Sequence, residues 1–158
     1  MDMESSTHDL VAAARDEGVR LRYQAKIRTF PESDCWWWTG AISGNGHGRI
    51  WLAEGWTVVA HRLGWAIAHP DEAIPALVGH ECDNPLCQRP VHWKPSTPAQ
   101  NRAEWAARRH RLGSPLRDKR GSLGRALAIR AALLAGDGPE AIAAQGLQAT
   151  DRDQLPLW

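Results

Sequence analysis

The sequence predicts a mixed α+β fold in which short β-strands are flanked by helices on both sides. Three observations carry this prediction. Short runs rich in tryptophan, valine and isoleucine lie between residues 35 and 60 and are separated by glycine-rich turns. Apolar residues recur at helical spacing before and after this region. The chain has 158 residues, 43% of them hydrophobic, which is enough for one domain with extensions.

The N-terminal part is predicted to be helical and then to change to strands. Apolar residues at helical spacing begin near Thr7, Gly18 interrupts them, and the proline-containing segment 30–33 ends the helix. From Cys35 to Ala60, three short β-rich runs alternate with turn residues, which predicts a twisted three-stranded meander.

A second alternation of helix and strand follows the meander. Residues 61–69 have the apolar spacing of a short helix that Pro70 ends. The apolar run 76–78 predicts a strand that ends near His80. The segment 81–95 is too rich in proline, cysteine and polar residues for regular structure.

The C-terminal third is predicted to be helical. Residues 97–100, Thr-Pro-Ala-Gln, supply an N-cap, a proline at the first helical position and a capping-box glutamine, which predicts a helix to about Arg111. Alanine-rich runs over 123–135 and 139–144 predict two more helices around a glycine turn. We interpret this pair as a structural appendage, with half of a helix-turn-helix as the alternative.

The charges are unevenly distributed in a chain that is nearly neutral as a whole. Residues 101–130 hold nine basic and two acidic side chains, whereas residues 131–158 hold four acidic and one basic. A basic segment of this density is a candidate surface for DNA phosphates, and a solvated helix with a linker is the alternative.

Membrane and secreted classes are not expected. No apolar run reaches the roughly 18 residues that a membrane span needs, and the N-terminus lacks the pattern of a signal peptide. We therefore expect a cytoplasmic protein without a membrane partner. Whether it is a monomer or a homodimer is left open by the sequence.

The three cysteines form an odd set, which argues against a disulfide framework. Cys82 and Cys87 are separated by four residues on one polar loop, a spacing within the range of zinc sites. Cys35 and one histidine could complete a tetrahedral set of ligands. The sequence therefore predicts a structural zinc site, and buried or incidental thiols are the alternative.

A series of short motifs runs through residues 35–105. In these motifs the chain resembles the HNH endonucleases, in particular a phage and bacterial subgroup that opens with Cys-Trp-x-Trp-Thr-Gly. Both termini lie outside the resemblance. The motifs, in order, are Cys35-Trp36-Trp37-Trp38-Thr39-Gly40, Gly46-His47-Gly48-Arg49-Ile50, Ala60-His61-Arg62 with Trp65, His80-Glu81-Cys82-Asp83-Asn84-Pro85-Leu86-Cys87, Pro90-Val91-His92 and Asn101.

The resemblance implies a ββα-metal fold for the core, in which one hairpin strand ends in the catalytic histidine and a helix returns a metal ligand. It implies that His80 is the general base for the water that attacks a DNA phosphate. It also implies that Asn101 helps to hold a catalytic Mg²⁺ or Mn²⁺, and that His61 supports this site. We infer that His92 is then the fourth zinc ligand beside Cys35, Cys82 and Cys87, with His80 in that place as the alternative.

Several arginines near this core are candidates for DNA contacts. The family pattern includes Arg62, whose planar guanidinium suits a phosphate, and pairing with an acidic residue is the alternative. Arg102, Arg108 and Arg109 belong to the helix that contains Asn101. There they would follow the DNA backbone and give affinity with little sequence information.

Three regions are thus predicted: an N-terminal helical extension over 1–34, an HNH nuclease domain with a zinc-stapled loop over 35–112, and a basic linker with a helical tail over 113–158. Gly79 stands where many HNH enzymes have an acidic metal ligand, so the catalytic ion either lacks this ligand or takes another, with His61 and Asp83 as candidates. This departure keeps open a second function, a catalytically weakened, zinc-stabilised DNA-binding module. A protein-interaction role for the tryptophan-rich surface is a third.

Overall fold

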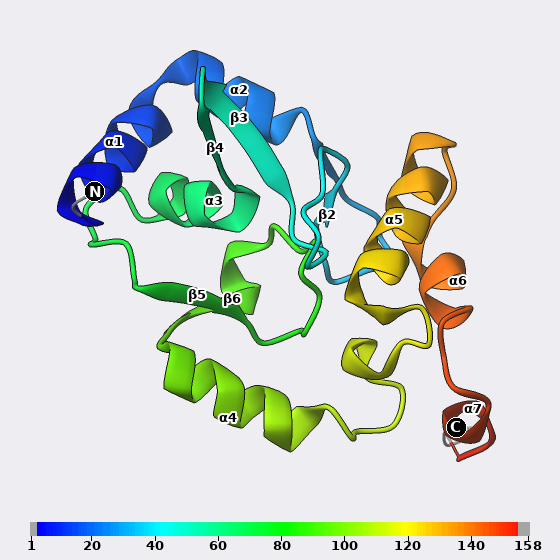
Figure 1. Cartoon of the computed structure of the whole chain (residues 1–158). Coiled ribbons are helices and arrows are strands. Elements are labelled where there is room, and N and C mark those ends of the chain that lie inside the picture. The colour runs from blue at the N-terminus through cyan, green and yellow to red at the C-terminus, as the bar shows by residue number, and fades with distance from the viewer. Residues whose placement is uncertain (1–2, 155–158) are drawn as a thin grey trace.

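The computed structural model describes the backbone of residues 3–154 and the side chains of residues 9–151. Trp158 and the outer ends of the two predicted terminal regions lie outside this part. Within it the chain combines helices with short two-stranded antiparallel sheets (Figure 1), so the predicted α+β class is confirmed. No helix in the described part is long and apolar enough to cross a membrane.

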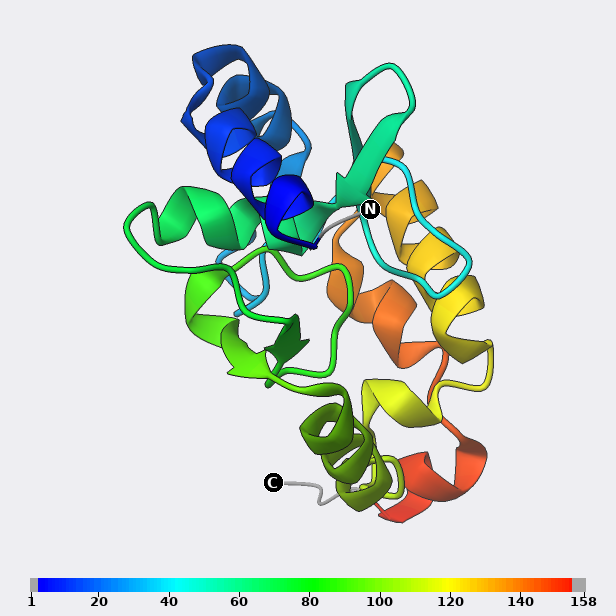
Figure 2. The same cartoon turned by 60° about the vertical axis from the view of Figure 1, so that its left-hand side comes forward.

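Two helices form the N-terminal region. α1 (Met3–Arg15) and α2 (Glu17–Gln24) are separated at Asp16, whose side chain accepts a hydrogen bond from a backbone N–H of α2 at 2.8 Å. The break thus lies at this aspartate N-cap and not at Gly18, because the cap satisfies the first free N–H groups of a new helix. Both helices contact α3 (Ala60–Ala68), as Figure 2 shows.

The prediction of a three-stranded meander over residues 35–60 is wrong, because its strands belong to two separate sheets. β1 (Ile27–Arg28) pairs with β2 (Trp37–Trp38), whereas β3 (Arg49–Ala53) and β4 (Trp56–Val59) form a separate hairpin. The glycine-rich segment before β3 closes on itself through an isolated bridge and leaves β2 without β3 as its neighbour. β2, the first strand of the predicted meander, therefore pairs with β1, which precedes it in the chain.

The third strand pair lies next to the cysteine loop. β5 (Leu77–His80) pairs antiparallel with β6 (Trp93–Ser96), and His80 lies opposite Trp93 at its end. The predicted strand that ends at His80 is confirmed. Residues 93–95, for which no regular structure was predicted, are in a strand because the loop returns them to the edge of β5.

A capped helix follows this strand pair directly. α4 (Pro98–Arg108) begins with the predicted capping box, in which Thr97 and Gln100 each bond to the other's backbone N–H. The helix ends three residues before the predicted limit at Arg111, in a turn that leads to the short 3₁₀ helix η2 (Pro115–Arg117).

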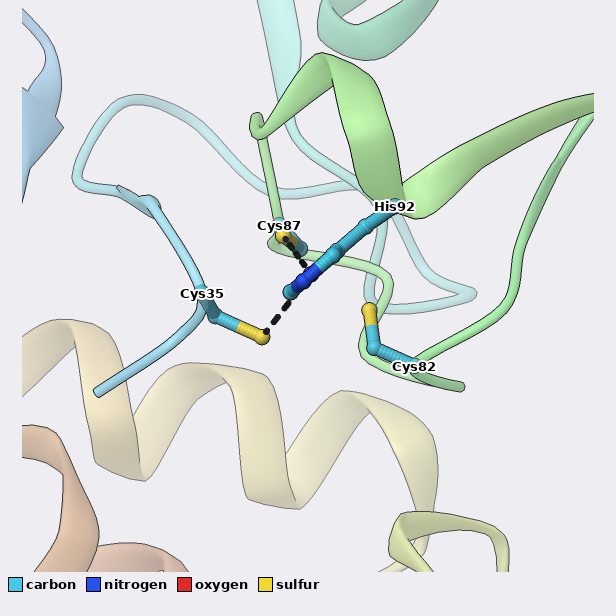
Figure 3. A group of neighbouring side chains, drawn as sticks. All are labelled: Cys35, Cys82, Cys87 and His92. Carbon is cyan, nitrogen blue, oxygen red and sulfur yellow. Dashed lines mark hydrogen bonds between the residues drawn. The ribbon is translucent and has the colours of Figure 1, made fainter.

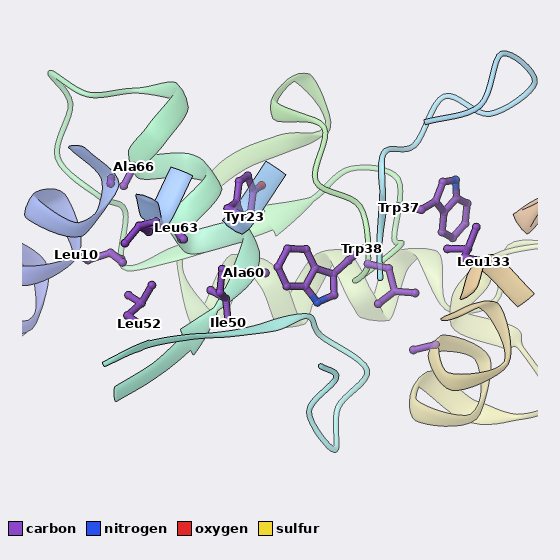
Figure 4. Close-up of a cluster of buried hydrophobic side chains, with 14 of the residues drawn as sticks. Leu10, Tyr23, Trp37, Trp38, Ile50, Leu52, Ala60, Leu63, Ala66 and Leu133 are labelled. Carbon is purple, nitrogen blue, oxygen red and sulfur yellow. The ribbon is translucent and has the colours of Figure 1, made fainter. Parts of the chain in front are cut away.

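The first C-terminal helix packs against β2 instead of belonging to a separate tail. α5 (Gly121–Leu134) and α6 (Pro139–Ala144) match the two predicted alanine-rich helices, and the short α7 (Ala149–Gln154) was not predicted. Leu133 of α5 lies beside Trp37 of β2 in the core (Figure 4). β2 is therefore covered on both faces, which explains why its two tryptophans are both buried.

The centre of the core holds Trp38, which is fully buried. Its ring lies 5.7 Å from that of Tyr23, and its indole N–H donates to the carbonyl of Ala41 at 3.0 Å. This hydrogen bond satisfies the polar atom that a buried indole brings into the core. Trp38 thus adds aromatic area to the core without leaving its polar atom unpaired.

Close packing of α3 gives a first prediction. A Cβ at Gly64 would overlap the Tyr23 hydroxyl and the Trp93 ring, whereas a Cβ at Gly44 would meet nothing within 4 Å. Because well-packed cores resist added methyl groups, Gly64→Ala is expected to lower the free energy of unfolding by about 1–3 kcal/mol. Gly44→Ala is the matched control, expected within about 0.5 kcal/mol of wild type in urea unfolding. Equal stability of the two variants would contradict this packing.

Candidate metal centre and adjoining histidine cavity

Three cysteines and one histidine converge at one point, as the sequence predicts (Figure 3). Cys35 precedes β2, Cys82 and Cys87 lie on the loop after β5, and His92 ends the short 3₁₀ helix η1 (Pro90–His92). The ligand atoms of all four lie within 4.8 Å of one another. Nδ1 of His92 is 3.4 Å from Sγ of Cys87 and 3.8 Å from Sγ of Cys35.

The two separations from Nδ1 of His92 fit a tetrahedral ion. Zinc bonds of about 2.3 Å to sulfur and about 2.0–2.1 Å to nitrogen imply ligand separations of roughly 3.5–3.8 Å. The backbone N–H of Arg89 also donates to Sγ of Cys87 at 3.5 Å, which favours the thiolate form that a metal needs. The four residues could therefore hold a metal ion such as zinc.

The electrostatics of the cluster also favour a cation. Hydrogen bonds from the thiols of Cys82 and Cys87 lower the pKa of Cys35, and the buried Asn84 amide lowers it further. The pKa of Cys82 is raised, because its thiol donates to Cys35 and a second negative charge would be half buried beside the first. A divalent ion would remove this repulsion between thiolates.

The loop that carries two of the cysteines is tightly wound. Asp83 adopts a left-handed conformation with φ of 56°, which is uncommon for a residue other than glycine. The next residue, Asn84, is buried, and its Oδ1 accepts from the backbone N–H of Leu86 at 3.3 Å and from Arg125 of α5 at 3.1 Å. The C-terminal helix α5 thus holds the cysteine loop in place.

A cavity of about 740 Å³ adjoins the metal centre, and we call it the histidine cavity. It lies between β5, α4 and the start of α5, and includes the three histidines His47, His61 and His80. The ring centroids of His61 and His80 are 4.4 Å apart, and that of His47 lies 5.5 Å from His61. The lining of the cavity also includes the side chains of Arg62, Asp83, Asn101, Arg108, Arg120 and Arg125.

His80 is held in one orientation by the cysteine loop. Its Nε2 lies 2.9 Å from the carbonyl oxygen of Cys87, which can only accept, so Nε2 carries the proton and Nδ1 is left as an acceptor. Trp93 of β6 donates to the same carbonyl at 3.1 Å. Burial lowers the pKa of His80 to about 4, so the ring is neutral at neutral pH.

His61 is a second neutral imidazole beside His80. Its Nε2 lies 3.1 Å from the carbonyl oxygen of Val78 and therefore donates to it, whereas its buried Nδ1 has no hydrogen-bond partner among the described residues. Burial lowers the pKa of His61 well below its usual value. An unpartnered nitrogen of this kind is a candidate ligand or acceptor for a group bound in the cavity.

Asn101 and Asp83 reach the cavity from two sides. Asn101 lies in the second turn of α4, and its exposed side chain lines the cavity opposite the strand that ends at His80. The Asp83 carboxylate lies 3.0 Å from the guanidinium of Arg108, although burial still raises the pKa of Asp83. The Asp83 carboxylate is thus already paired with Arg108, whereas the exposed Asn101 side chain has an amide oxygen that could bind a metal ion.

The predicted DNA-contact residues fall into two groups. Arg62 and Arg108 are engaged within the protein: Arg62 donates to the carbonyl of Pro75 at 2.9 Å, and Arg108 pairs with Asp83 and Glu104. Arg102 on α4 and Arg109 directly after it are exposed, and no salt bridge joins either to an acidic side chain within residues 9–151.

Part of the basic segment is neutralised by acidic residues of the same chain. Arg117 forms two hydrogen bonds to the Asp151 carboxylate, at 2.6 and 2.7 Å, and the hydrogen bonds of Arg117 lower the pKa of Asp151. Arg120 lies 2.8 Å from Asp118. These arginines brace the C-terminal segment, so the free positive charge is concentrated on α4 and the turn after it.

The buried contact between α5 and the cysteine loop gives a second prediction. The Arg125 guanidinium is buried and donates to Asn84, so Arg125→Leu would leave the amide oxygen of Asn84 with one fewer donor. Since hydrogen bonds to charged groups contribute about 1.5–3 kcal/mol, we expect unfolding to cost about that much less. Arg102→Leu, at an exposed site, is the control in the same urea titration. A change no larger than that of the control would show that α5 does not brace the loop.

Several cavity residues were not identified from the sequence. His47 enters the sequence prediction only within a family motif, and Arg120 and Arg125 only within the predicted basic linker and helical tail, 113–158. The motif Gly46-His47-Gly48-Arg49 was the available signal for His47, since its position among the family matches marks it as part of the core. No local pattern signalled that α5 would form a wall of the cavity.

Two proteins of Escherichia phage T7 are similar to this chain, whereas no family model and no solved structure matches it. Protein 2.8 is 37% identical over 70 residues, and the match spans 44% of this chain and about half (47%) of that protein. Protein 7.7 is 30% identical over 101 residues, which are 64% of this chain and 77% of that protein. On this coverage, the chain belongs to the family of T7 protein 7.7.

Proposed function

We propose that this chain is a metal-dependent HNH endonuclease that hydrolyses phosphodiester bonds in DNA. One observation carries the proposal. His80 ends β5 with Nδ1 left as an acceptor, in a cavity that also receives Asn101 from α4. The succession of β5, the cysteine loop, β6 and α4 also has the order of strands and helix that the resemblance to HNH enzymes implies.

The residues of the cavity supply the parts that phosphodiester hydrolysis requires. Neutral His80 can take a proton from water at Nδ1, because its other nitrogen is occupied by the Cys87 carbonyl. The Asn101 amide oxygen can bind a hard cation such as Mg²⁺ or Mn²⁺, for which His61 or Asp83 could add a second ligand. Such an ion would supply charge stabilisation at the phosphate.

The proposed zinc ion has a structural role in this scheme. Bound by Cys35, Cys82, Cys87 and His92, it would fix the loop whose Cys87 carbonyl orients His80. All four protein ligands are then used, which leaves no open position for substrate. The metal centre would act on catalysis through the orientation of the base.

Cleavage of supercoiled plasmid tests the proposal. The zinc-loaded protein is expected to convert the plasmid to nicked or linear forms with Mg²⁺ or Mn²⁺ and to stop when EDTA is added. Intact plasmid at full zinc occupancy with either ion would overturn the nuclease assignment.

A second function is favoured by Gly79, which places no carboxylate beside His80. A Cβ at Gly79 would meet no atom closer than 3.6 Å, so the fold has room for the first atom of an acidic side chain that the sequence does not supply. A zinc-stabilised DNA-binding module without cleavage is therefore the second candidate. Salt-dependent binding of plasmid without cleavage would support the module.

A further inference from the structure

Trp105 of α4 is not explained by packing within the chain. Its side chain is 48% exposed, and it lines the histidine cavity together with Asn101 and Arg108 of the same helix. Residues spaced by three and four positions share one face of a helix, so these three side chains lie on one face of α4. A large aromatic ring is therefore exposed next to the proposed reaction site.

The ring is oriented by a neighbouring arginine. The guanidinium carbon of Arg109 lies 4.5 Å from the Trp105 ring centroid, within the range of a cation–π contact. Trp105 also lines a second, smaller hollow with Arg109 and Leu116, and Leu116 lines both hollows. The indole thus lies between the histidine cavity and a second surface that is partly basic and partly apolar.

The charge around Trp105 suits a phosphate backbone. Arg102, Arg109 and Arg111 are exposed on α4 and the following turn, and no salt bridge occupies them within the described side chains. Proteins that bind single strands combine such positive charge with exposed aromatic rings, on which bases stack with little dependence on sequence. Apolar Leu116 and Leu123 extend the cavity wall beyond Trp105.

We propose that Trp105 is a stacking platform for an unpaired nucleobase, so that the histidine cavity takes single-stranded DNA. This inference rests on the proposed function, since it names the form of DNA that the same site would bind. Bases inside a duplex have their faces covered by neighbouring pairs, whereas an unpaired base can lie flat on the indole.

Binding to a fluorescein-labelled oligothymidylate and to a hairpin duplex tests the inference, with the full-length zinc-loaded His80→Ala protein used to prevent cleavage. Adding Trp105→Ala is expected to weaken single-strand binding by about tenfold or more and duplex binding much less. Trp105→Phe should restore most of the affinity. Trp51→Ala is the matched control, because Trp51 on β3 is also exposed, at 58%. It likewise lies beside an arginine, since the guanidinium carbon of Arg22 is 6.0 Å from its ring centroid.

The outcomes separate this inference from the nuclease proposal. Equal single-strand affinity of Trp105→Ala and Trp51→Ala would overturn the stacking site, whether or not the wild type cleaves DNA. Equal weakening for single strand and duplex would also overturn it. Selective loss of single-strand binding, with rescue by phenylalanine, would support the site even if plasmid cleavage fails and the nuclease proposal falls.

Discussion

Cys82→Ser is expected to yield protein with less than about half an equivalent of zinc and a strongly lowered melting temperature. Structural zinc in small domains contributes about 10–16 kcal/mol of apparent binding free energy, so loss of one ligand should cost several kcal/mol of it. The backbone hydrogen bonds of the loop between β5 and β6 belong to turns, one short 3₁₀ helix and isolated contacts, so no long helix or strand holds the cysteines together without the ion. Metal analysis and thermal unfolding with and without EDTA measure the effect.

A matched pair of histidine variants controls this prediction. His92→Gln removes the proposed nitrogen ligand, whereas His110→Gln changes an exposed histidine after α4. The first should lose zinc as Cys82→Ser does, and the second should retain about one equivalent, as expected of a complete tetrahedral site. Full zinc occupancy of His92→Gln would remove His92 from the ligand set and favour His80 in its place.

The cluster of three cysteines and one histidine was predictable because its members lie in short motifs. Two cysteines on one loop and a nearby histidine limit the possible partners of Cys35, and the structure gathers these four residues. The capping box at Thr97 was also predictable from the sequence, because helix geometry sets the three-residue spacing between its two members. In both cases the deciding contacts are between residues close in sequence or chemically distinctive.

Pairings across long sequence separations were not predictable. β2 has two residues, too few to show a periodicity, and its partner β1 lies before it in the chain. Arg125 reaches Asn84 across 41 residues, and the alanine-rich pattern of α5 predicts a helix without indicating what it packs on. Consequently the sequence assigned 113–158 to a linker and tail, whereas the structure places α5 against the cysteine loop.

His80→Ala is expected to reduce plasmid cleavage by about 100- to 10,000-fold, the usual contribution of a positioned general base. The effect should arise in catalysis and leave the metal centre intact, because His80 contacts the centre through the Cys87 carbonyl and not through a sulfur. Initial cleavage rates at matched protein and Mg²⁺ concentrations measure the loss. Zinc content measured on the same preparation should remain near that of wild type.

Trp51→Ala gives the baseline for this comparison, because Trp51 is exposed on β3 and lines neither the histidine cavity nor the hollow beside Trp105. It should cleave at the wild-type rate, so that the difference between the two alanine variants reports the base alone. Equal cleavage rates of the two variants would show that cleavage does not depend on His80. A contaminating nuclease would give this result. Loss of zinc from His80→Ala would instead indicate that the His80 ring is a zinc ligand. It would then count against His80 as the general base, because a zinc-bound imidazole nitrogen cannot accept a proton from water.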